Sequence, residues 1–110
     1  PDLRRALRGS MGALDALFES VLDYVDGGRR LAYRGADIAY EHAIFQLLAE
    51  VGDEGLVQPD LERELRIREL RPHLMPWLAT GMLVRDMRQS PTLLRVSSKL
   101  FVDWYLDRVL

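Results

Sequence analysis

The stretch RPHLMPWLATGMLVR, residues 71–85, decides how this chain folds. Leu70, Leu74 and Leu78 follow one another at steps of four, a spacing that predicts one face of a helix. Gly81 suits the left-handed position that commonly ends a helix, and the apolar residues after it predict a strand. We therefore expect a helix, a glycine stop and a strand in immediate succession.

Two prolines complicate this helix. Pro72 suits a first turn, where a missing N–H costs least. Pro76, four residues later, removes a donor and clashes with the preceding turn at a cost of about 3 kcal/mol, which predicts a kinked helix or one that starts late. The stretch also holds more large apolar side chains than one face can bury. Some of the apolar surface of Met75 and Trp77 is therefore expected to be exposed. It would form an apolar patch suited to a protein contact.

Size and composition limit the class of protein. The chain has 110 residues, 48% of them hydrophobic, which suits one compact domain with a real core. The absence of cysteine excludes disulfides and thiolate chemistry and favours a reducing, cytoplasmic setting. No apolar run approaches the roughly 20 residues of a membrane span, and no signal peptide is visible. The start at Pro1 is expected of a domain cut from a longer protein, although removal of a tag leaves the same start.

Charge is unevenly distributed behind the net value of −2. Residues 37–60 hold six acidic side chains and no Arg or Lys, whereas residues 61–110 hold nine basic and six acidic side chains. The second half is thus mildly basic, which is a weak signal for a polyanionic partner.

The N-terminal region predicts one long helix over residues 2–26, followed by a connector for which the pattern indicates no structure. Its apolar stripe, at steps of three and four, is Leu3, Leu7, Met11, Leu14, Phe18, Val21 and Val25. Gly9 and Gly12 weaken it by about 1 kcal/mol each relative to Ala, and the glycines at 27 and 28 end it.

The middle of the chain predicts two further helices and a short strand. Asp37 is a good N-cap for the first helix, and Gln58 or Asp60 for the second. The expected elements are a helix at 38–51, a strand at 56–57 and a helix at 61–67.

The C-terminal part predicts a hairpin and a last helix. Two strands, at 82–88 and 92–96, flank a turn at 89–91, and Ser97 or Ser98 caps a helix over 99–110. The inner side of that helix is expected to carry Leu100, Phe101, Trp104, Tyr105 and Val109. The expected core joins Trp77, Leu78, Leu83, Phe101 and Trp104 to Ile44, Leu48 and Leu65.

This order of elements resembles a winged helix-turn-helix, and the pattern L-x-x-x-L-x-x-G-x-L-V-R at residues 74–85 carries the likeness. The resemblance implies a mainly α fold: a three-helix core plus a β-hairpin wing, with a long N-terminal helix and a C-terminal helix. Residues 1–36 would form the N-terminal helix and connector, and residues 37–110 the winged-helix domain. The segment LLRVSSKLFVDWYL, residues 93–106, also resembles the end of winged-helix modules that follow the ATPase domain in STAND-type and related prokaryotic P-loop ATPases.

Motifs for catalysis are missing from the sequence. Lys99 is the only lysine and no glycine-rich loop precedes it, so any ATPase site would lie elsewhere in a parent protein. Neither His42 nor His73 has a second ligand at metal-binding spacing, and His73 is expected to be solvent-exposed. We therefore predict no enzyme, no cofactor and no metal site in this chain.

Two functions stay open. In a winged helix that binds DNA, the third helix enters the major groove and the wing follows the backbone. The residues at those positions are Arg66, Arg68, Arg71, His73, Met75, Arg85, Arg88 and Arg95. Against double-stranded DNA, residues 72–79 offer no Asn, Gln, Ser or Lys to read bases. The other function is a non-catalytic, regulatory interaction module that contacts its own chain, a sister subunit or a protein partner.

Self-association is the expected role of the N-terminal stripe. From Leu3 to Val25 the stripe is about 33 Å long at 1.5 Å per residue. This is longer than the body of a winged helix, whose radius of gyration is about 11 Å. Its first half, with Leu3, Leu7, Met11 and Leu14, is therefore expected to pack outside the domain, on a second copy in a homodimer or on a preceding domain. In the alternative, the helix bends at its glycines and folds back on its own body.

Overall fold

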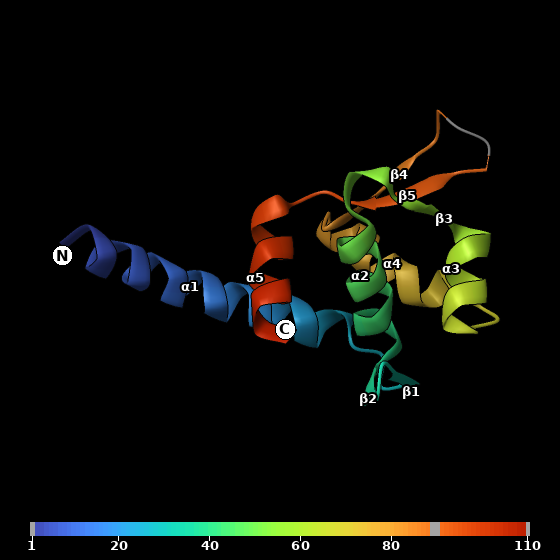
Figure 1. Ribbon diagram of the computed structural model, residues 1–110, viewed down its shortest axis with the longest axis horizontal. Coiled ribbons are helices and arrows are strands. Elements are labelled where there is room, and N and C mark those ends of the chain that lie inside the picture. Colours follow the sequence, from blue (N-terminus) through green and yellow to red (C-terminus); the bar gives the residue numbers. More distant parts are fainter. Residues whose placement is uncertain (1, 89–90, 110) are drawn as a thin grey trace.

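The computed structural model describes residues 2–88 and 91–109, without the side chains of residues 2–12 and 109. Within these residues the protein has five α-helices, one 3₁₀ turn and five short strands (Figure 1). The helices are α1 (Asp2–Val25), α2 (Tyr40–Val51), α3 (Gln58–Leu65), α4 (Arg71–Thr80) and α5 (Lys99–Val109). The strands are β1 (Arg30–Tyr33), β2 (Ala36–Ala39), β3 (Leu56–Val57), β4 (Leu83–Asp86) and β5 (Leu93–Val96). No helix among the described residues is long and apolar enough to cross a membrane.

The predicted N-terminal helix is confirmed, and its second half packs on the body. Phe18, Leu22 and Val25 are buried, and Leu14 is partly buried against the same core. The helix continues unbroken past Gly9 and its first half projects away from the rest of the molecule (Figure 1). It does not bend back on its own body.

A β-hairpin replaces the connector for which no structure was predicted. β1 and β2 pair in antiparallel register around a two-residue turn, in which Arg34 and Gly35 have φ values of 52° and 81°. Two positive φ values are the mark of a type I′ hairpin turn. The prediction for Asp37 is wrong, because this residue lies in β2 opposite Ala32 and α2 begins at Tyr40 without a side-chain cap. The expected division after residue 36 falls inside this hairpin.

The second sheet has the order β3–β5–β4 and is antiparallel throughout. It confirms the strand at 56–57 and the hairpin after Gly81; the expected turn falls on Gln89 and Ser90, outside the described residues. Gly55 precedes β3 with φ 65°, and a Cβ there would lie 2.4 Å from the carbonyl oxygen of Leu94. Only glycine fits so close to β5.

The expected caps of α3 are wrong, and so is a late start of α4; the alternative, a kink of α4 at Pro76, stays a prediction. Gln58 and Asp60 lie inside α3, whose N-cap is Val57 without a side-chain bond. α4 begins at Arg71 and continues through Pro76, although Pro76 has no N–H to donate to the preceding turn. Burial of the apolar side of α4 holds this helix together across the missing bond, and Gly81 ends it in the left-handed conformation, as predicted.

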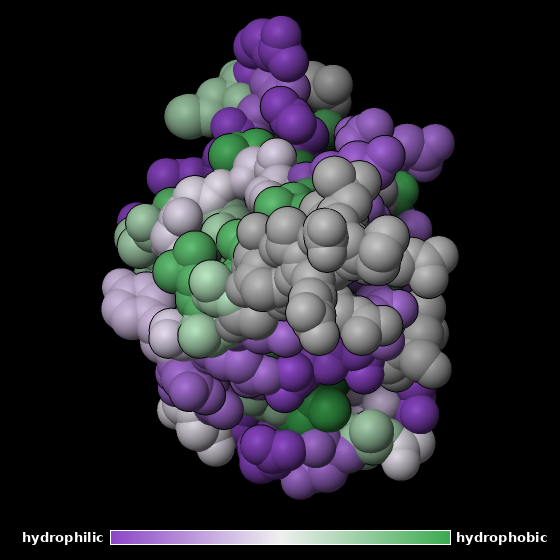
Figure 2. Space-filling model, turned by 90° about the vertical axis from the view of Figure 1, so that its left-hand side faces the viewer, coloured by the Kyte–Doolittle hydropathy of each residue, from purple (hydrophilic) through white to green (hydrophobic). Residues whose placement is uncertain are grey.

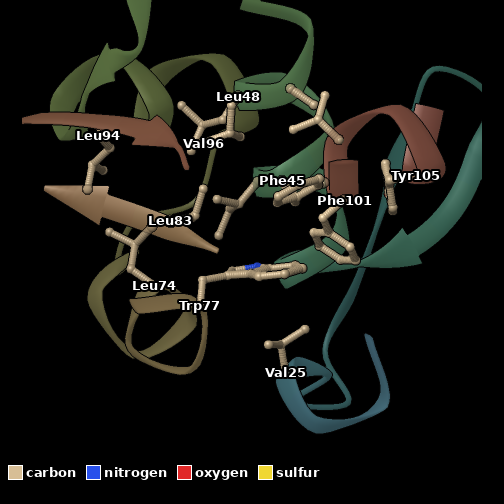
Figure 3. Close-up of a cluster of buried hydrophobic side chains, with 14 of the residues drawn as sticks. Val25, Phe45, Leu48, Leu74, Trp77, Leu83, Leu94, Val96, Phe101 and Tyr105 are labelled. Carbon is tan, nitrogen blue, oxygen red and sulfur yellow. The ribbon is translucent and has the colours of Figure 1, made fainter. Parts of the chain in front are cut away.

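The core lies where α2, α4 and α5 meet the sheet (Figure 3). Seven of the eight residues expected in one core belong to it, and the eighth, Leu78, is partly buried and packs against it. Trp77 is fully buried and stacks on Phe45. The prediction that Trp77 contributes to an apolar patch at the surface is therefore wrong. In α5, the N–H of Phe101 donates to the hydroxyl of Ser98 at 3.2 Å, which identifies the cap. Leu100 is exposed rather than inward, and the side chain of Val109 lies outside the described residues.

Candidate interaction surface

The structure divides the predicted contact residues among three places. Arg66, Arg68 and His73 line a hollow at the turn between α3 and α4, which we name the turn hollow; its volume is about 620 Å³. A second hollow, of about 330 Å³, lies between α4 and the β4–β5 hairpin, and we name it the wing hollow. It is lined by Gln58, Arg71, Leu74, Met75, Leu78 and Arg85. Arg88 and Arg95 line neither.

The wing hollow combines an apolar floor with a cationic rim. Leu74 is buried and Leu78 half-buried, whereas 47% of Met75 is exposed. Arg85 follows the buried Leu83 by two residues in β4, so its side chain lies on the same face of the sheet, the one that packs on the helices. The lining of this hollow therefore combines the exposed side chain of Met75 with two arginines, Arg71 and Arg85.

The other arginines of the hairpin point elsewhere. Arg95 lies opposite Val84, on the face of the sheet away from Arg85. Arg88 donates to both carboxylate oxygens of Asp86, from Nε at 3.0 Å and from Nη2 at 2.8 Å. These hydrogen bonds lower the pKa of Asp86 to about 2. The charge of Arg88 is thus balanced locally, and the arginines of the wing do not form one continuous positive face.

A buried ionisable pair lies beneath the turn hollow. Only 1% of Glu41 is exposed. One of its carboxylate oxygens accepts a hydrogen bond from the N–H of Gly27 at 3.0 Å, and the other contacts Nδ1 of His73. The indole N–H of Trp77 donates to the backbone carbonyl of Glu41 at 2.9 Å. This network ties the end of α1 to α2 and α4.

The prediction that His73 is solvent-exposed is wrong, because its side chain is only 11% exposed. Sequence reasoning missed the pair because no periodicity connects positions 41 and 73, which come together only when α2 packs on α4. His42, the other histidine, is half-buried and lies 3.3 Å from the carbonyl oxygen of Leu22. Among the side chains that the structure describes, no group of three or more His, Cys, Asp or Glu is arranged to hold a metal ion.

The expected self-association surface lies largely outside the side chains described, because Leu3, Leu7 and Met11 belong to the first twelve residues. Beyond them, α1 leaves 56% of Leu17 and 64% of Tyr24 exposed. Figure 2 views the molecule from the side toward which α1 projects and shows hydrophobic residues gathered near its middle, with hydrophilic residues above and below.

Comparisons of the chain with protein-family models, with curated proteins and with solved structures found no match. The described residues form a helix-rich domain with two small antiparallel sheets, and arginines lie around the exposed surface of α4.

Proposed function

We propose that this chain is a non-catalytic winged-helix module of a longer protein, which binds a protein segment in its wing hollow. The element order supports the fold: α2, β3, α3, α4 and the β4–β5 hairpin follow one another as the helices, strand and wing of a winged helix-turn-helix do. The sheet order β3–β5–β4 matches that arrangement. In it, α4 is the third helix.

The exposure of Met75 in the wing hollow carries the proposal. An exposed apolar side chain in the same hollow as Arg71 and Arg85 suits a segment that combines apolar with acidic residues, because each part finds its complement. The outward residues of α4, by contrast, supply no amide with which to read a base. The wing arginines also diverge, so a long phosphate backbone meets no continuous row of cations.

The test uses short synthetic peptides in which Leu and Phe alternate with Glu and Asp, measured by fluorescence anisotropy. We expect Met75→Glu to weaken binding about tenfold or more, because it places a carboxylate in the apolar floor. Met87→Glu is the matched control, since Met87 is 76% exposed and lies outside the wing hollow. Equal losses in both variants, or equal binding of peptides with Lys in place of the acids, would contradict the proposal.

DNA binding is the second candidate, and the convergence of Arg71, Arg85 and Gln58 on one hollow favours it. For a mixed-sequence duplex titrated at low and high salt, Arg71→Ala should weaken binding and lower the salt slope by about one counterion. Arg88→Ala should do less, because Asp86 already balances that charge. Absence of binding at about 50 mM salt excludes this candidate for the domain.

A further inference from the structure

The turn hollow concentrates three arginines from two separate segments of the chain. Its basic side chains are Arg29, from the linker after α1, and Arg66 and Arg68, from the turn between α3 and α4. Glu69 is the one acidic side chain in its lining. None of these three arginines forms an ion pair with a described residue. The arginines that do are Arg30, Arg34, Arg63, Arg88 and Arg108.

The walls of this hollow are held in place from below. The guanidinium of Arg29 lies 5.3 Å from the centre of the Tyr40 ring, and that ring meets the imidazole of His73 edge-on at 4.9 Å. His73 is fixed in turn by the buried carboxylate of Glu41. That carboxylate is directed at Gly27 and His73, so it is already engaged when a ligand enters. Arg29, which is held against Tyr40, therefore loses less conformational freedom on meeting an anion than an unsupported side chain does.

The backbone adds to the positive electrostatic potential in the turn hollow. α4 starts at the hollow, which Pro72 and His73 of its first turn line, and the N-terminal end of a helix carries a partial positive charge. Arg66 ends α3 with φ 56° and ψ 39°, a left-handed position usually occupied by glycine. An arginine there costs more backbone strain than a glycine would.

We propose that the turn hollow is a binding site for a phosphate monoester. A doubly charged phosphate group takes hydrogen bonds from several guanidinium groups at once, and the planar arginine fork matches its oxygens. The volume of about 620 Å³ exceeds that of a phosphate group and falls in the range of small-molecule sites, so the hollow also has room for the group that carries the phosphate. This site is separate from the wing hollow, and its failure would leave the proposed protein contact untouched.

The test is a titration followed by NMR shifts of the arginine side chains at constant ionic strength. The probes are inorganic phosphate, a phosphoserine peptide and adenosine monophosphate, each compared with chloride. We expect binding of inorganic phosphate to the wild type, and tighter binding of whichever monoester matches the natural source. Arg66→Gly should weaken binding about tenfold while the domain keeps or gains stability, because glycine relieves the positive φ. Arg68→Gln should weaken binding to a similar degree.

Arg85→Ala is the matched control, because it removes one arginine from the wing hollow and none from this site. Phosphate binding should be unchanged in this variant. Equal weakening by Arg85→Ala and Arg66→Gly would mean a general charge effect and would overturn the proposal. Tighter binding of duplex DNA than of any monoester, with the same dependence on Arg66, would overturn the proposal and would indicate a contact with the phosphate backbone of DNA instead.

Discussion

Trp77 offers the sharpest test of the position of α4. Its side chain is fully buried, stacks on Phe45 with ring centres 4.7 Å apart, and donates its N–H to the carbonyl of Glu41 at 2.9 Å (Figure 3). Replacing a buried Trp with Ala costs about 3–5 kcal/mol in lost contacts and cavity. A domain of this size has a total stability of about 5–15 kcal/mol. We therefore expect Trp77→Ala to be folded only marginally at room temperature.

Trp77→Phe separates the ring from the hydrogen bond. Phenylalanine keeps the contact with Phe45 but removes the hydrogen bond to the Glu41 carbonyl, a net loss of about 0.5–1.5 kcal/mol because that carbonyl still accepts a bond within α2. The assay is urea unfolding followed by circular dichroism, with Met75→Ala as the control on the same helix; that half-exposed side chain should cost less than about 1 kcal/mol. If Trp77→Ala unfolded at the same urea concentration as wild type, or if Met75→Ala cost as much, α4 would present a different face to the core.

Three further predictions concern other elements. Trp104→Ala should lower stability by about 3–5 kcal/mol, because Trp104 packs on both Phe18 and Phe101; unchanged thermal unfolding would show that α5 is misplaced. Burial raises the pKa of Tyr105 to about 12, so the protonated form is favoured in the folded state and stability should fall as the pH rises from about 10 to about 12. Tyr105→Phe should reduce the slope of the urea midpoint over that window without abolishing it, because burial raises the pKa of Tyr33 as well; an unchanged slope would contradict this cause. A Leu7→Glu, Met11→Glu double variant should sediment as a monomer beside a wild-type dimer, and identical monomers would refute self-association through α1.

The helices and the second sheet could be predicted because their signals are local. Apolar residues at steps of three and four mark the buried sides of α1, α2 and α4, and Gly81 stops α4 at the predicted residue. The eight expected core residues come together because each lies on the apolar side of its own element. Periodicity within an element is enough to tell inside from outside when a chain has one core.

The β1–β2 hairpin escaped prediction because its signals are weak or compete. Its turn pairs Arg34 with Gly35, and an arginine with positive φ gives no sequence signal. Asp37 has a good capping side chain, yet pairing of β2 with β1 places it in a strand. α4 likewise continues through Pro76 because burial of Leu74 and Trp77 outweighs one missing hydrogen bond.

The sequence by itself determined the element types outside the β1–β2 hairpin and most of the core, since these depend on residue type and short-range spacing. Tertiary structure decided which charged residues meet. Arg85 and Arg95 lie on opposite faces of the sheet, because side chains alternate along a strand. Arg29 and Arg66 are 37 positions apart in the sequence but line the same hollow. Glu41 and His73 pair because α2 packs on α4. The spacing of charged side chains along the sequence does not indicate which charged residues of other elements lie near them. Their neighbours are decided by how the apolar sides of the elements pack together.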